Sequence, residues 1–200
     1  MKYIIEHMEE GFSPWVHLEY KTISSEVGPD SLILSSIKDG VEVPSDFKCT
    51  STSLDVTKLT EILPEYSLDR VCLLDPRATQ ELVPEDGEKF DYFLFGGILG
   101  DDPPCDRTGM LRKLGFQGRH LGSVQMTTDT AVRVTQKVVD GKQRLESIDF
   151  VDHPTIKFNK FEGVEMPFRY IKDQTGQPIM PEGMLALIKK DNERTLDDLL

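Results

Sequence analysis

The sequence predicts an α/β fold in which a mostly parallel sheet carries helices on both faces. Its strands are short, continuous apolar runs such as residues 71–74 and 92–95, a pattern typical of parallel strands buried on both sides. Capped amphipathic stretches separate these runs, so strand and helix alternate along the chain. The length of 200 residues favours one domain, and 38% apolar with 29% charged residues excludes the disordered and fibrous classes.

A strand–helix–strand unit occupies the first 35 residues. Residues 2–5 are an apolar run suited to a buried strand, and Ser13 with Pro14 fits an N-cap followed by proline at the first helical position. The apolar face of this helix has spacings of four, three and four residues: Val16, Tyr20, Ile23 and Val27. Gly28-Pro29 ends the helix, and residues 32–34 form the next strand, parallel to the first.

The alternation continues as far as residue 151. Further buried strands are expected at residues 71–74, 92–95 and 148–151. Helices are expected around residues 54–63, around 78–82, over 110–114 and over 127–139, the last being the longest. Residues 152–200 then change character, with alternating apolar positions, a short helix over 181–190 and an acidic end. We therefore expect a core of residues 1–151 and a C-terminal extended arm, residues 152–200, packed on it.

The charge balance bears on the partner. The chain has 35 acidic and 23 basic residues, a formal net charge of −12, and residues 61–106 alone carry a net charge of −9. Proteins that hold nucleic acid need Lys and Arg against the phosphates, so stable nucleic-acid binding is not expected. An acidic surface attracts a basic partner over a distance, although many soluble proteins are acidic without such a partner.

Neither targeting segments nor metal motifs are evident. The first residues turn acidic at Glu6 before a signal peptide could form, and no apolar run approaches the ~20 residues of a membrane span. Cys49, Cys72 and Cys105 are odd in number and lack ligand spacing with one another or with histidine. We expect reduced thiols, no metal, no membrane association and a cytoplasmic location.

Loops that follow strands are the candidate binding segments, because ligands of α/β sheets bind beyond the carboxyl ends of the strands. Here they are residues 6–11, 75–78, 96–103 and 119–128. The glycine-rich segment is G-G-x-x-G-D, which is not the dinucleotide fingerprint, and Pro103-Pro104 prevents a helix from starting there toward a phosphate. Its glycines allow close approach of a ligand, with a tight strand-end turn as the alternative.

Three of these segments resemble, in order, the cofactor loops of the SPOUT methyltransferases. They are Asp75-Pro76, the run GGILGD from Gly96 to Asp101, and the run LGSVQMTTDTA from Leu121 to Ala131. The last is similar to the superfamily's L-G-x-x-x-L-R-T-E-T-A, from which Gln125-Met126-Thr127 departs. Residues 1–11, with Trp15 and Glu19, resemble in particular the fungal SPOUT protein arginine methyltransferases.

The resemblance implies a fold and an activity that composition and periodicity cannot supply. It implies a SPOUT-type fold with a deep trefoil knot, which holds S-adenosylmethionine and releases S-adenosylhomocysteine. It implies methyl transfer to a guanidinium nitrogen of arginine in a KH-domain protein of the small ribosomal subunit. SPOUT enzymes usually dimerise, but the arm could cover that surface, so we expect a monomer. An RNA methyltransferase of the same fold and a non-catalytic cofactor-binding module are the alternatives.

Twelve residues of the matched loops are expected to contact the cofactor, mostly through the backbone. They are Leu74, Asp75, Pro76, Gly96, Gly97, Gly100, His120, Leu121, Gly122, Gln125, Met126 and Thr128. A valine at Gly97 or Gly122 is expected to fill space that the cofactor needs. Removal of residues 152–200 is expected to leave these contacts in place.

Methylation of arginine requires carboxylates, because the guanidinium is always protonated and its lone pairs are delocalised. Bidentate pairing with a carboxylate orients one nitrogen toward the methyl group. Four acids are the expected catalytic residues: Glu9 first, then Glu6 and Glu10, then Asp101, with Asp102 beside it. A solvated loop residue or a cap is the alternative for each. Trp15 is expected to anchor the helix in the core rather than to cover the arginine.

Overall fold

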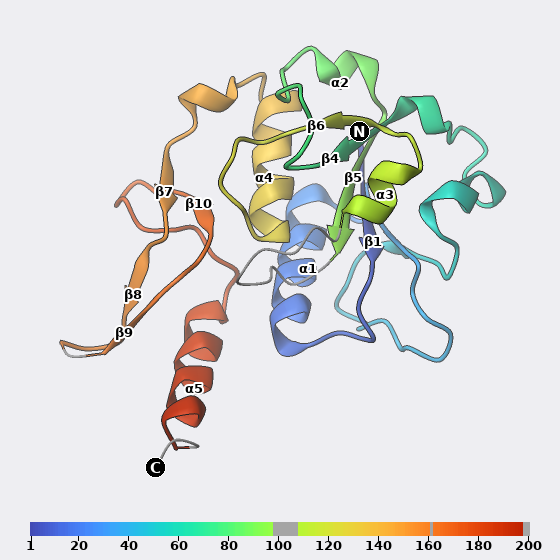
Figure 1. The fold of residues 1–200 in the computed structure, drawn as a ribbon. Coiled ribbons are helices and arrows are strands. Elements are labelled where there is room, and N and C mark those ends of the chain that lie inside the picture. Colours follow the sequence, from blue (N-terminus) through green and yellow to red (C-terminus); the bar gives the residue numbers. More distant parts are fainter. Residues whose placement is uncertain (98–107, 161, 198–200) are drawn as a thin grey trace.

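The computed structural model describes residues 1–97, 108–160 and 162–197. Their central feature is a six-stranded sheet in the order β3-β2-β1-β5-β4-β6, with every neighbouring pair parallel (Figure 1). The strands are β1 (Lys2–His7), β2 (Leu32–Ser35), β3 (Thr50–Ser51), β4 (Val71–Leu74), β5 (Tyr92–Gly97) and β6 (Gln117–Arg119). The α/β class predicted from the continuous apolar runs is confirmed.

Side chains alternate between the two faces of the sheet, and each face has its own cover. Tyr3 and Ile5 of β1 face α1 (Pro14–Val27) and α4 (Thr128–Val139), which pack side by side. Ile4 faces the opposite layer, formed by the 3-10 helix η1 (Val56–Glu61) and the short α3 (Gly109–Lys113). Strands buried on both faces explain why the runs in the sequence are continuous rather than alternating.

The two helices that pack side by side on one face of the sheet, α1 and α4, begin as the sequence indicates. The Ser13 hydroxyl accepts a hydrogen bond from the Val16 N–H at 3.2 Å, with Pro14 at the first turn, and Gly28 ends α1 at a φ of +86°. Thr127 precedes α4 in an extended conformation. Both helices follow strands, β1 and β6, whose carboxyl ends lie at the same edge of the sheet, so both helices start at that edge.

Two local predictions differ from the structure. Residues 78–82 form no helix, because their backbone pairs with the chain after β6: His120 N–H donates to Gln80 O and Leu82 N–H to His120 O. The short helix nearby is α2 (Asp86–Lys89). With 12 residues, α4 is not the longest helix, since α1 and α5 (Met184–Asp197) each have 14.

The C-terminal segment forms a separate structure beside α1 and α4 (Figure 1). The predicted core strand at 148–151 is instead β7 (Phe150–Asp152), and it pairs antiparallel with β10 (Arg169–Ile171) rather than with the central sheet. A hairpin of β8 (Thr155–Lys157) and β9 (Gly163–Glu165) follows β7. The predicted division at residue 151 therefore falls inside a strand.

Apolar packing joins this segment to α1. Phe168, Tyr170 and Met184 form a buried cluster against which Trp15 and Leu18 of α1 are packed. None of the described helices is both long and apolar enough to span a bilayer. The trefoil knot implied by the resemblance stays a prediction, since residues 98–107 lie outside the described part of the chain.

Candidate functional site

The strands β5, β4 and β6 are neighbours, so the three predicted loops leave the sheet at one edge. Leu74 is in register with Arg119, and His7 of β1 is in register with Gly97. Asp75, Gly97 and His120 therefore lie at the carboxyl ends of adjacent parallel strands, where α/β proteins bind ligands. Gly100, which was expected to contact the cofactor, lies outside the described residues.

The first loop is shaped by an ion pair. Asp75 is buried, and its carboxylate accepts two hydrogen bonds from Arg112 of α3, at 2.5 Å from Nε and 2.7 Å from Nη2. It also accepts the main-chain N–H of Arg77 at 3.0 Å. This arrangement fixes the turn and leaves Pro76 exposed at the edge. Asp75 thus acts as a support of the loop.

The third loop combines apolar anchors with a special backbone. Leu121 is buried and Met126 is packed against the core, while Gly122 has a φ of +99°, in the region that favours glycine. The Gly122 N–H donates to His120 Nδ1 at 3.1 Å, and Gln125 O accepts the main-chain N–H of Arg169 at 2.8 Å. With Gly96 and Gly122 only half-buried, backbone is accessible to a ligand at this edge. These features fit a cofactor held mainly through the backbone.

The space that a side chain at Gly97 would need is occupied by other parts of the protein. A Cβ atom at Gly97 would lie 2.2 Å from Tyr20 Oη and 2.5 Å from Ile5 Cγ2. A larger residue there would collide with the packing between β1, β5 and α1 before it met any ligand. The absence of a side chain at Gly97 is therefore explained by the close approach of Tyr20 to the strand.

Glu6, one of the four predicted catalytic acids, is buried on the face of the sheet that η1 covers, opposite α1 and α4. Its carboxylate accepts hydrogen bonds from the Ser35 and Ser36 hydroxyls at 2.5 and 2.6 Å and from the Val56 N–H at 3.1 Å. Ser36 has a φ of 57°, so the carboxylate holds a strained turn and the start of η1 together. The arrangement favours a structural role for Glu6.

The other predicted acids differ in placement. Glu10 is exposed and forms an ion pair with Lys38. Glu9 is half-buried, and its charge lies close enough to raise the pKa of Glu19 and of Tyr20. Asp101 and its neighbour Asp102 lie outside the described residues. Of the predicted acids that are described, Glu9 is the one placed near a cluster of buried acids.

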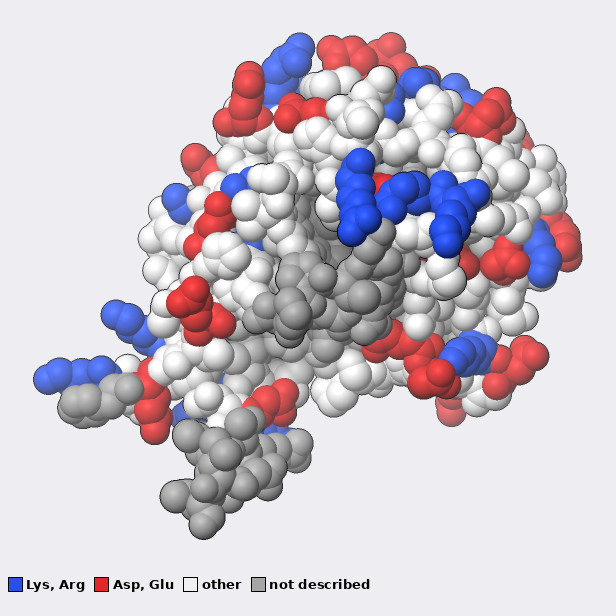
Figure 2. Space-filling model, viewed as in Figure 1, with Lys and Arg blue, Asp and Glu red and all other residues white. Residues whose placement is uncertain are grey.

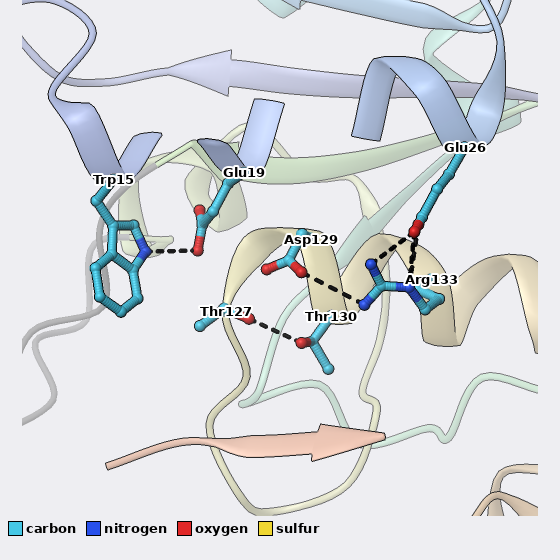
Figure 3. Close-up of polar contacts among 7 residues, drawn as sticks. All are labelled: Trp15, Glu19, Glu26, Thr127, Asp129, Thr130 and Arg133. Atoms are coloured by element: carbon cyan, nitrogen blue, oxygen red, sulfur yellow. Dashed lines mark hydrogen bonds and ion pairs between the residues drawn. The ribbon is translucent and has the colours of Figure 1, made fainter. Parts of the chain in front are cut away.

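That cluster consists of Glu19 on α1 and Asp129 on α4, which face the space between the two helices (Figure 3). Glu19 is 2% exposed and Asp129 fully buried. Trp15 Nε1 donates to Glu19 Oε1 at 2.9 Å. Oδ1 of Asp129 has no hydrogen-bond partner among the described residues. Two buried carboxylates side by side are unfavourable unless a cation or a proton lies with them.

Arg133 forms ion pairs with Asp129 and with Glu26. Arg133 Nη1 is 3.4 Å from Asp129 Oδ2, and its Nη2 is 2.7 Å from Glu26 Oε1 (Figure 3). Burial raises the pKa of Asp129, and the Arg133 charge opposes this rise. Burial and the nearby Asp129 raise the pKa of Glu19 well above its usual range, and none of the described Lys or Arg side chains pairs with it. These causes favour the protonated form of Glu19.

The C-terminal segment adds a third polar side chain, Tyr170, near the two acids. Tyr170 of β10 is 1% exposed, and its hydroxyl has no partner among the described residues. Burial raises the pKa of Tyr170, and the charges of Asp129 and Glu19 raise it further. Unpartnered buried polar atoms are rare in native proteins, and one within the acid pair with a second near it indicates a place for a polar ligand.

Neither acid was predicted as a site residue, although Glu19 left a signal in the sequence. Glu19 lies four residues before Ile23 and three after Val16, hence on the apolar face of α1, where an acid is unusual. Asp129 lies in the first turn of α4, where an acid is commonly a favourable partner of the helix dipole. Only the packing of α1 against α4 shows that the two acids meet.

The surface around the site is mixed in charge rather than uniformly acidic. Figure 2 shows Lys and Arg gathered over α3, which carries Arg112 and Lys113, and acids distributed around them. The net negative charge of the whole chain therefore does not make this face uniformly acidic. The described residues contain no group of three or more His, Cys, Asp or Glu arranged to hold a metal ion.

Comparisons with known proteins agree with this geometry. The protein arginine N-methyltransferase SFM1 of Saccharomyces cerevisiae is 52% identical over 212 residues, covering all of both chains. The crystal structure of the yeast arginine methyltransferase SFM1 complexed with SAM has a TM-score of 0.90 at 52% identity, covering 95% of this chain and 90% of that one. The complex with SAH has a TM-score of 0.89 at 51% identity, covering 94% of each chain.

A more distant neighbour extends the match in fold alone. The crystal structure of the dual-specific Trm10 from Thermococcus kodakaraensis has a TM-score of 0.54 at 17% identity, covering 72% of this chain and 95% of that one. Together these neighbours confirm the SPOUT-type α/β fold class. Residues 2–195 match the family described as protein arginine N-methyltransferase SFM1-like. On this match and on the full-length identity to the yeast protein, the chain belongs to the SFM1-like family of protein arginine N-methyltransferases.

Proposed function

We propose that this protein is an S-adenosylmethionine-dependent protein arginine N-methyltransferase in which Glu19 and Asp129 bind the substrate guanidinium. The observation that carries the proposal is the buried acid pair, which lies where α4 leaves the third cofactor loop and has an unpartnered oxygen on Asp129. The SFM1 structures complexed with SAM and with SAH support the cofactor.

A guanidinium is the cation that suits this pair. It is planar, always charged and presents five N–H donors, so it can donate to two carboxylates at once in fixed directions. Its charge offsets the repulsion between Glu19 and Asp129, and the Tyr170 hydroxyl is placed to complete the hydrogen bonding. Trp15 Nε1, which donates to Glu19, fixes the orientation of that carboxylate. Such pre-arranged groups orient one nitrogen for an in-line reaction.

The reaction leaves one proton to be placed. S-adenosylmethionine, when bound, supplies a methyl group on a positively charged sulfur. A guanidinium nitrogen forms a bond to the methyl carbon as the carbon–sulfur bond breaks, and the substituted guanidinium then loses one proton. We propose as its acceptor the base Asp129, whose ionised form is favoured by the charge of Arg133 against the effect of burial. Burial favours the protonated form of Glu19, and a proton held there is released to solvent when the guanidinium binds.

The proposed substrate is a basic protein of the small ribosomal subunit. The net charge of −12 favours its approach. We propose that Glu9, whose charge acts on Glu19, meets the arginine first. A cytoplasmic location agrees with such a substrate. We also propose that the protein is a monomer, because the packing of Phe168 and Met184 on Trp15 and Leu18 covers that side of α1.

Transfer of labelled methyl from S-adenosylmethionine to purified 40S proteins and, separately, to ribosomal RNA tests the proposal. Label in a protein, recovered as methylarginine after hydrolysis and lost in Glu19→Gln, supports it. Label in RNA would instead make the chain an RNA methyltransferase. Cofactor binding without transfer to either would make it a binding module. Sedimentation at micromolar protein tests the monomer, and a dimer would contradict it.

A further inference from the structure

Arg169 of β10 joins the C-terminal segment to the third cofactor loop. Its main-chain N–H donates to Gln125 O at 2.8 Å, and Arg169 forms an isolated parallel bridge with Met126. The loop residues are therefore paired with a strand that belongs to a different part of the chain. The partner strand is itself held in place, since β10 pairs with β7 along its length.

The side chain of Arg169 lies beside the same loop. Its guanidinium makes two hydrogen bonds to Asp152 of β7, at 2.6 Å from Nε and 2.8 Å from Nη2, and lies 4.8 Å from the centre of the Phe150 ring. Its Nη1 lies close to Gly122: a Cβ atom placed on that glycine would be 3.3 Å away. Arg169 thus contacts the loop at Gln125 through its backbone, and its side chain lies beside Gly122.

We propose that Arg169 is a positioning residue that holds residues 122–126 in the conformation that binds S-adenosylmethionine. This inference rests on the proposed function, since it takes that loop to be a cofactor loop. Gly122, with its φ of +99°, gives the loop conformational freedom that must be lost when a ligand binds. A loop that is already held in place binds more tightly, because the ordering cost is met before binding.

The same contacts change what is expected of the arm. Removal of residues 152–200 was expected to leave the cofactor contacts in place, but it would remove both Arg169 and its partner Asp152. The arm is therefore expected to support the cofactor loop as well as to cover α1. Point substitutions test this more cleanly than truncation, because they leave the apolar packing of the arm intact.

The test measures binding of S-adenosylhomocysteine to the full-length protein by calorimetry. Arg169→Gln is expected to raise Kd about five- to thirtyfold. Asp152→Asn, which removes only the anchor of the guanidinium, should raise it less, and the double variant should match Arg169→Gln because both act through one contact. In steady-state assays the KM for S-adenosylmethionine should rise while the KM for the protein substrate stays within twofold, a split that general destabilisation would not produce.

Arg70→Gln is the matched control. Arg70 also forms two hydrogen bonds with an aspartate, Asp91, at 2.8 and 2.7 Å, but the pair lies at the amino ends of β4 and β5, on the opposite edge of the sheet. A similar change in melting temperature without a change in Kd is expected. A Kd within twofold of wild type in folded Arg169→Gln would overturn the inference. If Arg169→Gln does not fold, an unchanged Kd in Asp152→Asn would overturn it. No binding by the wild type would overturn the proposed function instead.

Discussion

Replacing Glu19 by glutamine should slow methyl transfer and, at neutral and alkaline pH, stabilise the protein. Glutamine keeps the volume of the side chain and an oxygen that can accept the Trp15 Nε1 hydrogen bond, which is 2.9 Å long in the structure. It removes the charge that the substrate guanidinium would meet. An effect on activity and stability in opposite directions is typical of a functional group buried at a cost to the fold.

The size of the kinetic effect depends on burial. Glu19 is 2% exposed, so a guanidinium bound to it is shielded from water. Loss of one partner from such a pair costs about 2–4 kcal/mol, or about 30- to 1,000-fold in kcat/KM. The side chain of Glu10 is 92% exposed and pairs with Lys38. Water screens an exposed pair of this kind, so Glu10→Gln, the control, should lower kcat/KM by no more than about fivefold.

The effect on stability has a defined sign. The pKa of Glu19 is raised in the folded protein by burial and by Asp129. The unfolded chain therefore loses its proton at lower pH than the folded one, and stability falls as the pH rises from the unfolded pKa toward the folded pKa. Glutamine does not titrate. The melting temperature of Glu19→Gln should exceed that of the wild type at pH 8 by more than it does at pH 4.

Methylation of the substrate and thermal denaturation at several pH values measure both effects. The reasoning would be refuted by Glu19→Gln protein with kcat/KM within threefold of wild type. It would also be refuted by a melting temperature that is lowered at pH 8 and unchanged at pH 4. The first result would remove Glu19 from the substrate site, and the second would show that its carboxylate is stabilising when charged.

Three further predictions concern the same site. Because the guanidinium needs an ionised Glu19 and the pKa of this group is raised, kcat/KM should increase with pH in stopped assays between pH 6 and 9, and the Glu19→Gln profile should be flatter. Tyr170→Phe should leave the midpoint of urea denaturation unchanged, because the hydroxyl has no partner among the described residues. It should lower kcat/KM about two- to tenfold. A lowered midpoint would show that the hydroxyl stabilises the fold. Gly97→Ala should destabilise the fold by about 1–3 kcal/mol in urea denaturation, because the new Cβ would lie 2.2 Å from the Tyr20 hydroxyl oxygen. Tyr20→Phe in the same chain removes that oxygen and should restore part of the lost stability. No restoration would mean that the collision lies elsewhere.

Much of the fold could be predicted from apolar periodicity, because that pattern records which backbone segments are buried. β1, α1, β2, β4, β5 and α4 lie where continuous runs and capped helical faces placed them. The segment at 148–151 was assigned to the wrong sheet, since an apolar run indicates burial but not the strand with which it pairs. The helix expected around 78–82 is absent because its backbone is used in pairing with His120.

The carboxylates of the site show the limit of the sequence more clearly. Glu6 stood in a loop that matched the expected chemistry, yet Ser35, Ser36 and Val56, all distant in sequence, occupy its oxygens. Asp75 was expected to contact the cofactor and is bound on one side by Arg112. Which partners a polar group finds depends on how separate elements pack, and no local pattern records it.

The sequence by itself determined the α/β class, the order of its buried strands and the three loops that resemble those of SPOUT methyltransferases. These follow from local properties: runs of apolar residues, capping residues and glycines at strand ends. The tertiary structure decided which acids lie together at the proposed site. Glu19 and Asp129 lie on helices far apart in the chain, and they meet only because α1 and α4 start at the same edge of a parallel sheet and pack against each other. Their shared burial, which shifts their pKa values and prepares them for a cation, is a property of that contact and of neither segment alone.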